Sequence, residues 1–279
     1  MRAFEDWVLG PALILLLPLA GFAQSGAGPA ISPSDLVRRV IANELKPQAE
    51  RNSWVYDSEK EEAGKKQTKR VVQTREGSLE ILVAVDGQPL SADKQREEAE
   101  RIEKIASHPR ERQKLEQEQK KDAEQCEAFF KMIPDAFLFN FEGREGDFIR
   151  LSFKPNPAFQ SSSREGRVLH VMEGELLVHS KYERLASISG RLAEEVKFGG
   201  GLLGYLDKGG TFSVKRTEVT PGQWMMTSMN VNMNGKALFI KTIAVQQKES
   251  RSNFQELGQD ATLADAANIL TNRIVLAEK

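Results

Sequence analysis

Two groups of residues in this 279-residue chain have types and spacing that could support chemistry: a glycine-rich segment and a methionine-rich predicted strand. Residues 199–204 read GGGLLG, which satisfies the G-x-G-x-x-G pattern of dinucleotide-binding loops. Such a loop must follow a strand and open a long helix inside a parallel β-α-β unit. Only about one or two helical turns fit before Gly209-Gly210. The pattern therefore predicts a glycine-rich connection and no nucleotide site.

The predicted strand at 223–233 carries a stripe of soft apolar side chains. The residues expected on one face of it are Met225, Met229, Val231 and Met233. Methionine is flexible and polarizable, so such a face suits a cavity that accepts acyl chains of variable shape. An ordinary core needs the same face, and the stripe alone favours a core; a ligand cavity is the alternative.

The other residue types that could catalyse a reaction or hold a metal lack the spacing that such sites need. His170 and His179 lie nine positions apart, so they would face opposite sides of an uninterrupted strand, and His108 is distant from both. The single cysteine, Cys126, excludes a disulfide within the chain. No nucleophile signature such as G-x-S-x-G is present. We expect no catalytic residue, no metal site and no cofactor.

The composition points away from nucleic acid. The chain has 39 basic and 40 acidic side chains, a formal net charge of −1, whereas a nucleic-acid binder needs a basic excess to displace phosphate counterions. Its hydrophobic fraction of 40% is ordinary for a globular protein. The length allows one large domain or two small ones.

The first residues resemble an export signal. A membrane span needs about 20 apolar residues, whereas the apolar run at 8–22 is shorter, contains prolines and ends in small residues that suit a signal peptidase. We expect a signal peptide at 1–23 cleaved near Ala23, a flexible leader at 24–33 and a soluble periplasmic protein. An uncleaved N-terminal anchor is the alternative.

An amphipathic helix is expected at 35–45. The apolar stripe that predicts it comprises Leu36, Val37, Val40, Ile41 and Leu45. Ser34 is the expected N-cap and Pro47 the stop. Because the helix is short, its stripe must lie on another apolar surface, and we expect Leu36 and Val40 to contribute to any ligand cavity.

Strand patterns surround a helical insertion. Alternating residues predict antiparallel strands from Trp54 to Val85 and again from 137 to 247, with a hairpin turn at Asn234-Gly235. Between them, 91–131 is dense in charge and predicts two solvated helices divided at His108-Pro109. The segment 258–279 is expected to be weakly helical, either docked or mobile. The predicted class is α+β: one domain at 34–257, an antiparallel half-barrel or curved sheet with covering helices.

Several segments resemble the LolA/LolB-like fold of exported lipoprotein carriers. They are DLVRRVIANEL (35–45), WVYDSE (54–59), VDGQPLS (85–91), LSFKPNP (151–157), VKFGGGLLGYLDKGGTF (196–212) and GKALFIKT (235–242). The resemblance implies a half-barrel whose concave apolar face lies under helices and receives acyl chains or hydrophobic peptide.

Three functional hypotheses follow. The first is an exported, non-enzymatic carrier that buries an acyl chain or lipoprotein, with the helix at 35–45 opening and closing the cavity. The second is an envelope structural or interaction protein that uses the charged helices at 91–131 as its partner surface. The third is an exported hydrolase built on two converging carboxylates.

Overall fold

The computed structural model describes residues 31–46, 52–201, 203–237 and 241–277, and its compact unit is Ser32–Lys279. The predicted signal peptide at 1–23, most of the leader at 24–33 and the predicted stop at Pro47 lie outside the described residues, so these remain predictions.

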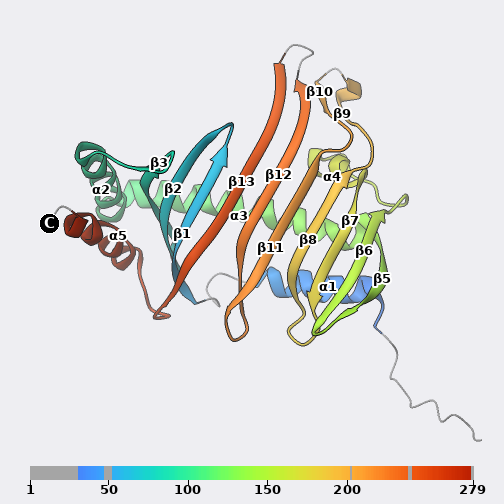
Figure 1. Ribbon diagram of the computed structural model, residues 1–279, viewed down its shortest axis with the longest axis horizontal. Coiled ribbons are helices and arrows are strands. Elements are labelled where there is room, and N and C mark those ends of the chain that lie inside the picture. Colours follow the sequence, from blue (N-terminus) through green and yellow to red (C-terminus); the bar gives the residue numbers. More distant parts are fainter. Residues whose placement is uncertain (1–30, 47–51, 202, 238–240, 278–279) are drawn as a thin grey trace, which may run out of the picture. The chain divides into compact units, whose positions relative to one another are not determined.

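The described residues form helices and one large sheet (Figure 1). The helices are α1 (Pro33–Glu44), α2 (Ala92–Ser107), α3 (Pro109–Ala136), α4 (Arg164–Leu169) and α5 (Leu263–Ala277). The first strands are β1 (Ser53–Glu62), β2 (Lys65–Thr74), β3 (Gly77–Val85), β4 (Gln88–Pro89), β5 (Phe137–Glu145), β6 (Phe148–Pro155) and β7 (Met172–His179). The later strands are β8 (Arg184–Leu192), β9 (Val196–Phe198), β10 (Gly204–Leu206), β11 (Thr211–Thr220), β12 (Gln223–Ala237) and β13 (Lys241–Leu257).

The strands build a 13-stranded sheet in which every pair is antiparallel. Its main path is β4-β3-β2-β1-β13-β12-β11-β8-β7-β6-β5, with β9 and β10 attached beside β12. The sheet is open, because β4 and β5 end this path without pairing with each other. The predicted α+β class with an antiparallel sheet and helices is confirmed.

Helix α1 lies against the half of the sheet built from β5 to β8, and its cap differs from the prediction. Ser32, not Ser34, is the N-cap, and its Oγ accepts a hydrogen bond from Asp35 N at 3.1 Å. Pro33 explains the difference, since proline at the first helical position has the required φ and needs no N–H acceptor. Four residues of the predicted stripe are buried, with Val40 only 1% exposed, and Leu45 is partly buried.

The described residues form three clusters of buried apolar side chains, and the two larger clusters lie under different helices. The larger one joins α1 and the C-terminal end of α3 to β5–β8. The smaller one joins Val55, Val72 and Leu79 to α2 and α5. Side chains alternate between faces along a strand, so Val55 and its neighbour Trp54 point to opposite sides of β1.

The segment 258–279 contains a docked helix, because α5 packs on α2, β2 and β3.

The charged insertion forms the two predicted helices. Helix α2 ends at Ser107, and α3 begins at Pro109 and continues beyond 131 to Ala136. Ile102 of α2 is fully buried in the smaller core, and Phe129 and Phe130 of α3 pack against the larger one. Met132 packs there as well, so the C-terminal end of α3 is docked on the sheet.

The predicted hairpin turn at Asn234-Gly235 is wrong. Both residues lie inside β12, where Gly235 pairs with Ile243 of β13 and with Leu206 of β10. A Cβ at Gly235 would lie 2.1 Å from the carbonyl oxygen of Tyr205. The glycine is thus required by the close approach of β10 and not by a turn.

Candidate functional site

A cavity of about 750 Å³ lies between α1, α3 and the sheet. Its apolar lining from the helices comprises Val37, Val40, Ile41, Phe129, Phe130, Ile133 and Leu169. The apolar lining from the strands includes Phe137, Phe153, Leu176, Ile188, Phe212 and Val214. Volumes of about 300–1,000 Å³ with a mainly apolar lining are typical of small-molecule sites.

The sheet register explains which side chains reach this cavity. On β11, Phe212, Val214 and Arg216 occupy alternate positions and therefore point to the same face. All three line the cavity, in the order apolar, apolar, charged. Gly190 of β8 pairs with Phe212, and its missing side chain leaves room for the phenylalanine ring.

The predicted ligand residues are distributed around the cavity. Val40 and Met225 line it, Leu36 is buried in the adjoining core, and Met233 packs against that core. Met229 and Val231 pair with Val214 and Phe212. They therefore share the face of the cavity but are not part of its wall.

The prediction that Met225 shares a face with Met229 is wrong. The register shifts between Lys215 and Arg216, so Met225 pairs with Thr217 while Met229 pairs with Val214. This bulge adds one residue to β12 and breaks the alternation of faces there, so the neighbours Met225 and Met226 both line the cavity. Met226 takes the position opposite Arg216 and also lines the cavity.

One end of the cavity contains a buried ion cluster. Glu44, the last residue of α1, has a side chain only 4% exposed, and its carboxylate contacts Arg184 of β8 and Arg216 of β11. Arg184 Nε lies 3.3 Å from Glu44 Oε1, and Arg216 Nη1 donates to Oε2. Arg216 Nη2 also donates to the carbonyl oxygen of Trp224 at 2.6 Å. These contacts hold the end of α1 to the sheet.

The charged side chains that line the cavity share one sign. In the described part of the chain they are Lys46, Arg184, Arg216 and Arg251. Arg251 Nε lies 2.6 Å from Glu249 Oε1, and its guanidinium lies over the Tyr56 ring at 5.2 Å. Burial raises the pKa of Tyr56, an effect that the charge of Arg251 partly offsets.

The sequence reasoning missed this cluster, although Glu44 gave a signal. Glu44 lies seven residues after Val37 and therefore continues the apolar stripe of the helix. A carboxylate on a buried stripe needs partners. The identity of those partners, which lie on β8 and β11, depends on the sheet order.

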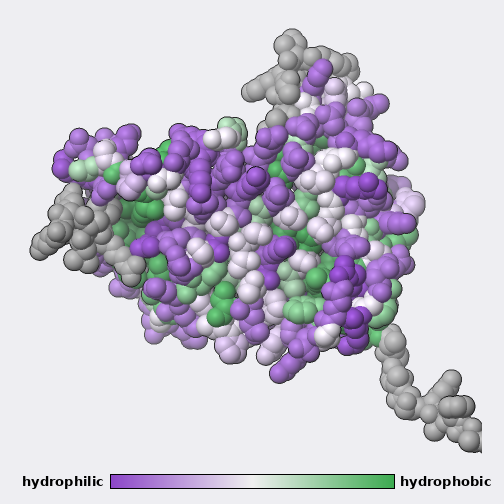
Figure 2. All heavy atoms as spheres, in the orientation of Figure 1, coloured by the Kyte–Doolittle hydropathy of each residue, from purple (hydrophilic) through white to green (hydrophobic). Residues whose placement is uncertain are grey.

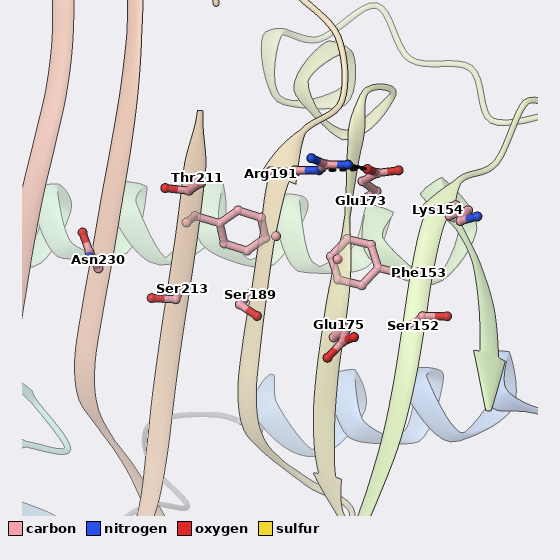
Figure 3. A pocket seen from close by; sticks show the side chains of 13 residues that line it. Ser152, Phe153, Lys154, Glu173, Glu175, Ser189, Arg191, Thr211, Ser213 and Asn230 are labelled. Carbon is pink, nitrogen blue, oxygen red and sulfur yellow. Dashed lines mark hydrogen bonds and ion pairs between the residues drawn. The ribbon is translucent and has the colours of Figure 1, made fainter. Parts of the chain in front are cut away.

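A second, shallower groove of about 640 Å³ lies on the face of the sheet opposite the cavity (Figure 3). Ser152, Glu175, Ser189, Ser213 and Asn230 form one row across five strands. Figure 2, in the orientation of Figure 1, shows hydrophilic side chains over much of this face.

Two of the charged groups in this groove, Arg191 and Glu173, form an ion pair. Arg191 Nη2 lies 2.8 Å from Glu173 Oε1, and the dashed line in Figure 3 marks this pair. Phe153 and Phe212 line both the groove and the cavity, and their rings occupy the space beside Gly174 and Gly190. The rings thus lie between the two hollows. The groove is the more open and more polar of the two, so the mainly apolar cavity is the better candidate site.

Comparisons with protein-family models, with curated proteins and with solved structures found no match to this chain. Membership of the lipoprotein-carrier family therefore remains a prediction. Among the described helices, none combines the length and the hydropathy that a membrane span requires. Within the described ranges, no group of three or more histidine, cysteine or acidic side chains is placed to hold a metal ion.

Proposed function

We propose that this protein is a non-enzymatic carrier that binds an acyl chain, free or attached to a lipid or lipoprotein, in the cavity under α1. The observation that carries the proposal is the cavity of about 750 Å³ with its mainly aliphatic and aromatic wall. Transfer of an acyl chain from water into such a space contributes about 0.8 kcal/mol per CH₂ group.

Helix α1 is the movable element in this proposal. It supplies Val37, Val40 and Ile41 to the wall, and its end is held by the ion cluster at Glu44. Displacement of this one helix would open the wall while the sheet stays intact. With the predicted signal peptide at 1–23, the carrier would act in the periplasm.

A cavity-filling variant tests the proposal. Val214→Trp places an indole in the cavity, whereas Lys215→Trp places the same side chain on the exposed opposite face of β11. Native mass spectrometry of the full chain, mixed with laurate, should show a bound ligand for the wild type and for Lys215→Trp and a strongly reduced bound fraction for Val214→Trp. Equal binding by both variants, or no binding by the wild type, would contradict the carrier function.

The second candidate is an interaction protein that binds its partner through α2 and α3. The observation that favours it is the exposed, charged surface of α3 between Arg110 and Ala128. Laurate binding at the cavity would be absent in this case, and charge-reversal variants such as Lys120→Glu with Lys121→Glu would abolish capture of a partner from envelope extracts.

A further inference from the structure

The end of the cavity at Arg216 has the properties of an anion site. The described charged residues that line the cavity are all basic, and two of them, Arg184 and Arg216, contact the same carboxylate. Placing cations against an apolar chamber is costly unless anions accompany them. The only residue that supplies a carboxylate to both arginines is Glu44, among the described ion pairs.

We propose that the ligand is an anionic amphiphile whose carboxylate or phosphate head group binds at Arg216 in place of Glu44. The inference rests on the proposed acyl-binding function and adds the head-group chemistry to it. In the structure, Glu44 occupies the position that the ligand's anion takes after exchange.

The hydrogen bonds of Arg216 support this assignment. Its Nη1 donates to Glu44 and its Nη2 to the carbonyl oxygen of Trp224, but its buried Nε has no acceptor among the described residues. The indole Nε1 of Trp224 is also buried without an acceptor there. A carboxylate or phosphate carries several acceptor positions and matches the planar guanidinium fork. An anion that replaces one Glu44 oxygen can therefore engage donors that Glu44 leaves unused.

The position of Glu44 makes the exchange feasible. Glu44 belongs to α1, whereas Arg216 belongs to β11, so the two separate when α1 moves. After separation, the incoming anion neutralises Arg216. Head-group binding and displacement of the helix end are thereby coupled.

The direction of the bound chain follows from β11. Arg216, Val214 and Phe212 line the cavity at successive inward positions, so along β11 the wall passes from a charged to an aliphatic and then to an aromatic side chain. A head group at Arg216 directs the tail past Val214 toward Phe212 and Phe153. An amphiphile with a single acyl chain has both groups that this arrangement requires, an anionic head for Arg216 and an apolar tail for the wall at Phe212 and Phe153.

The test compares ligands with the same chain and different heads. Isothermal titration of the full-length protein uses laurate, dodecyl phosphate and dodecanol. We expect both anions to bind at least about tenfold more tightly than dodecanol, as is typical of a charge-assisted hydrogen bond. Preference for one anion over the other would identify the head as a carboxylate or a phosphate.

Variants test whether the preference for anionic ligands over dodecanol comes from the ion cluster at Glu44. Arg216→Gln should reduce laurate affinity to about that of dodecanol, and Lys215→Gln, which removes the neighbouring charge on the opposite face, should leave it unchanged. Glu44→Gln removes the competing carboxylate and should raise affinity for laurate but not for dodecanol. If the substitution only loosened α1, the affinity for laurate and the affinity for dodecanol would both rise.

The outcomes separate this inference from the carrier function. If dodecanol and both anions bind equally well to the wild type, the anion site is wrong and the acyl cavity stands. If none of the three ligands binds, the carrier function itself is wrong. The comparison in the wild type needs no variant to fold, so it decides the question even where Arg216→Gln is unstable.

Discussion

The carboxylate of Glu44 accepts a hydrogen bond from the backbone N–H of Leu185 at 3.3 Å, across 141 residues of sequence. This contact joins the last residue of α1 to β8, next to Arg184. Helix α1 is thus held at its C-terminal end by one side chain that bonds to the backbone and to two guanidinium groups.

Replacing this carboxylate should destabilise the fold strongly. Glu44→Ala leaves Arg184 and Arg216 largely buried without it, and removal of one partner from a buried pair costs about 3–5 kcal/mol. Urea unfolding followed by circular dichroism measures the change. Glu173→Ala, which breaks the more exposed pair with Arg191, should cost at most about 1 kcal/mol. Similar losses in the two variants would refute the structural role of Glu44.

The glycine pair under the aromatic rings should not tolerate a side chain. A Cβ at Gly174 would lie 2.0 Å from the carbonyl oxygen of Ser189 and 2.9 Å from Phe153 Cζ. Since backbone atoms cannot yield as side chains do, Gly174→Ala should cost about 3 kcal/mol, the upper end of the overpacking range. Gly258→Ala, where nothing lies within 4 Å, is the control and should be near neutral. Thermal unfolding of both variants gives the comparison.

Docking of the charged insertion should depend on one isoleucine. Ile102 of α2 is fully buried against the core beneath α5, so Ile102→Ala should destabilise the protein by about 2–5 kcal/mol. Leu138→Ala removes a side chain that is 52% exposed and should change stability little. Hydrogen exchange should show faster exchange in α2 and α5 of the Ile102 variant. Unchanged exchange there would mean that the insertion docks by other contacts.

The buried phenol of Tyr56 should make stability depend on alkaline pH. Burial raises its pKa above the ordinary 10.0 despite the opposing charge of Arg251. Because the unfolded chain then releases this proton first, the contribution to stability is present below about pH 10 and is lost as the pH rises above it. Denaturant unfolding across this range should show a smaller alkaline loss for Tyr56→Phe than for the wild type. Equal losses would exclude this group as a source.

The elements with strong local patterns were predictable from the sequence. The stripe from Leu36 to Leu45 predicts α1, and proline at 109 places the break between α2 and α3. The hairpin signal at Asn234-Gly235 failed because a nearby strand, β10, demands glycine for a different reason. Local turn chemistry cannot distinguish these two needs.

The candidate site was predictable only in part. The soft apolar stripe indicated the correct strand, and Val40 and Met225 line the cavity. The bulge that moves Met225 out of phase with Met229 has no clear signature in the sequence. The ion cluster escaped prediction because Arg184 and Arg216 lie 140 and 172 residues after Glu44 in the sequence. Only the order of the strands in the sheet shows that the three side chains meet.

The pairing of β1 with β13 constrains the order in which the chain folds. Ser53 pairs with Leu257, so an early strand waits for one of the last strands to leave the ribosome. Contacts of such sequence separation are slow to form because loop closure must precede them. Until β13 arrives, β1 and β12 present unpaired edges that invite association with other chains. Folding yield should therefore fall steeply with protein concentration, and a helper that shields these edges during synthesis would raise it.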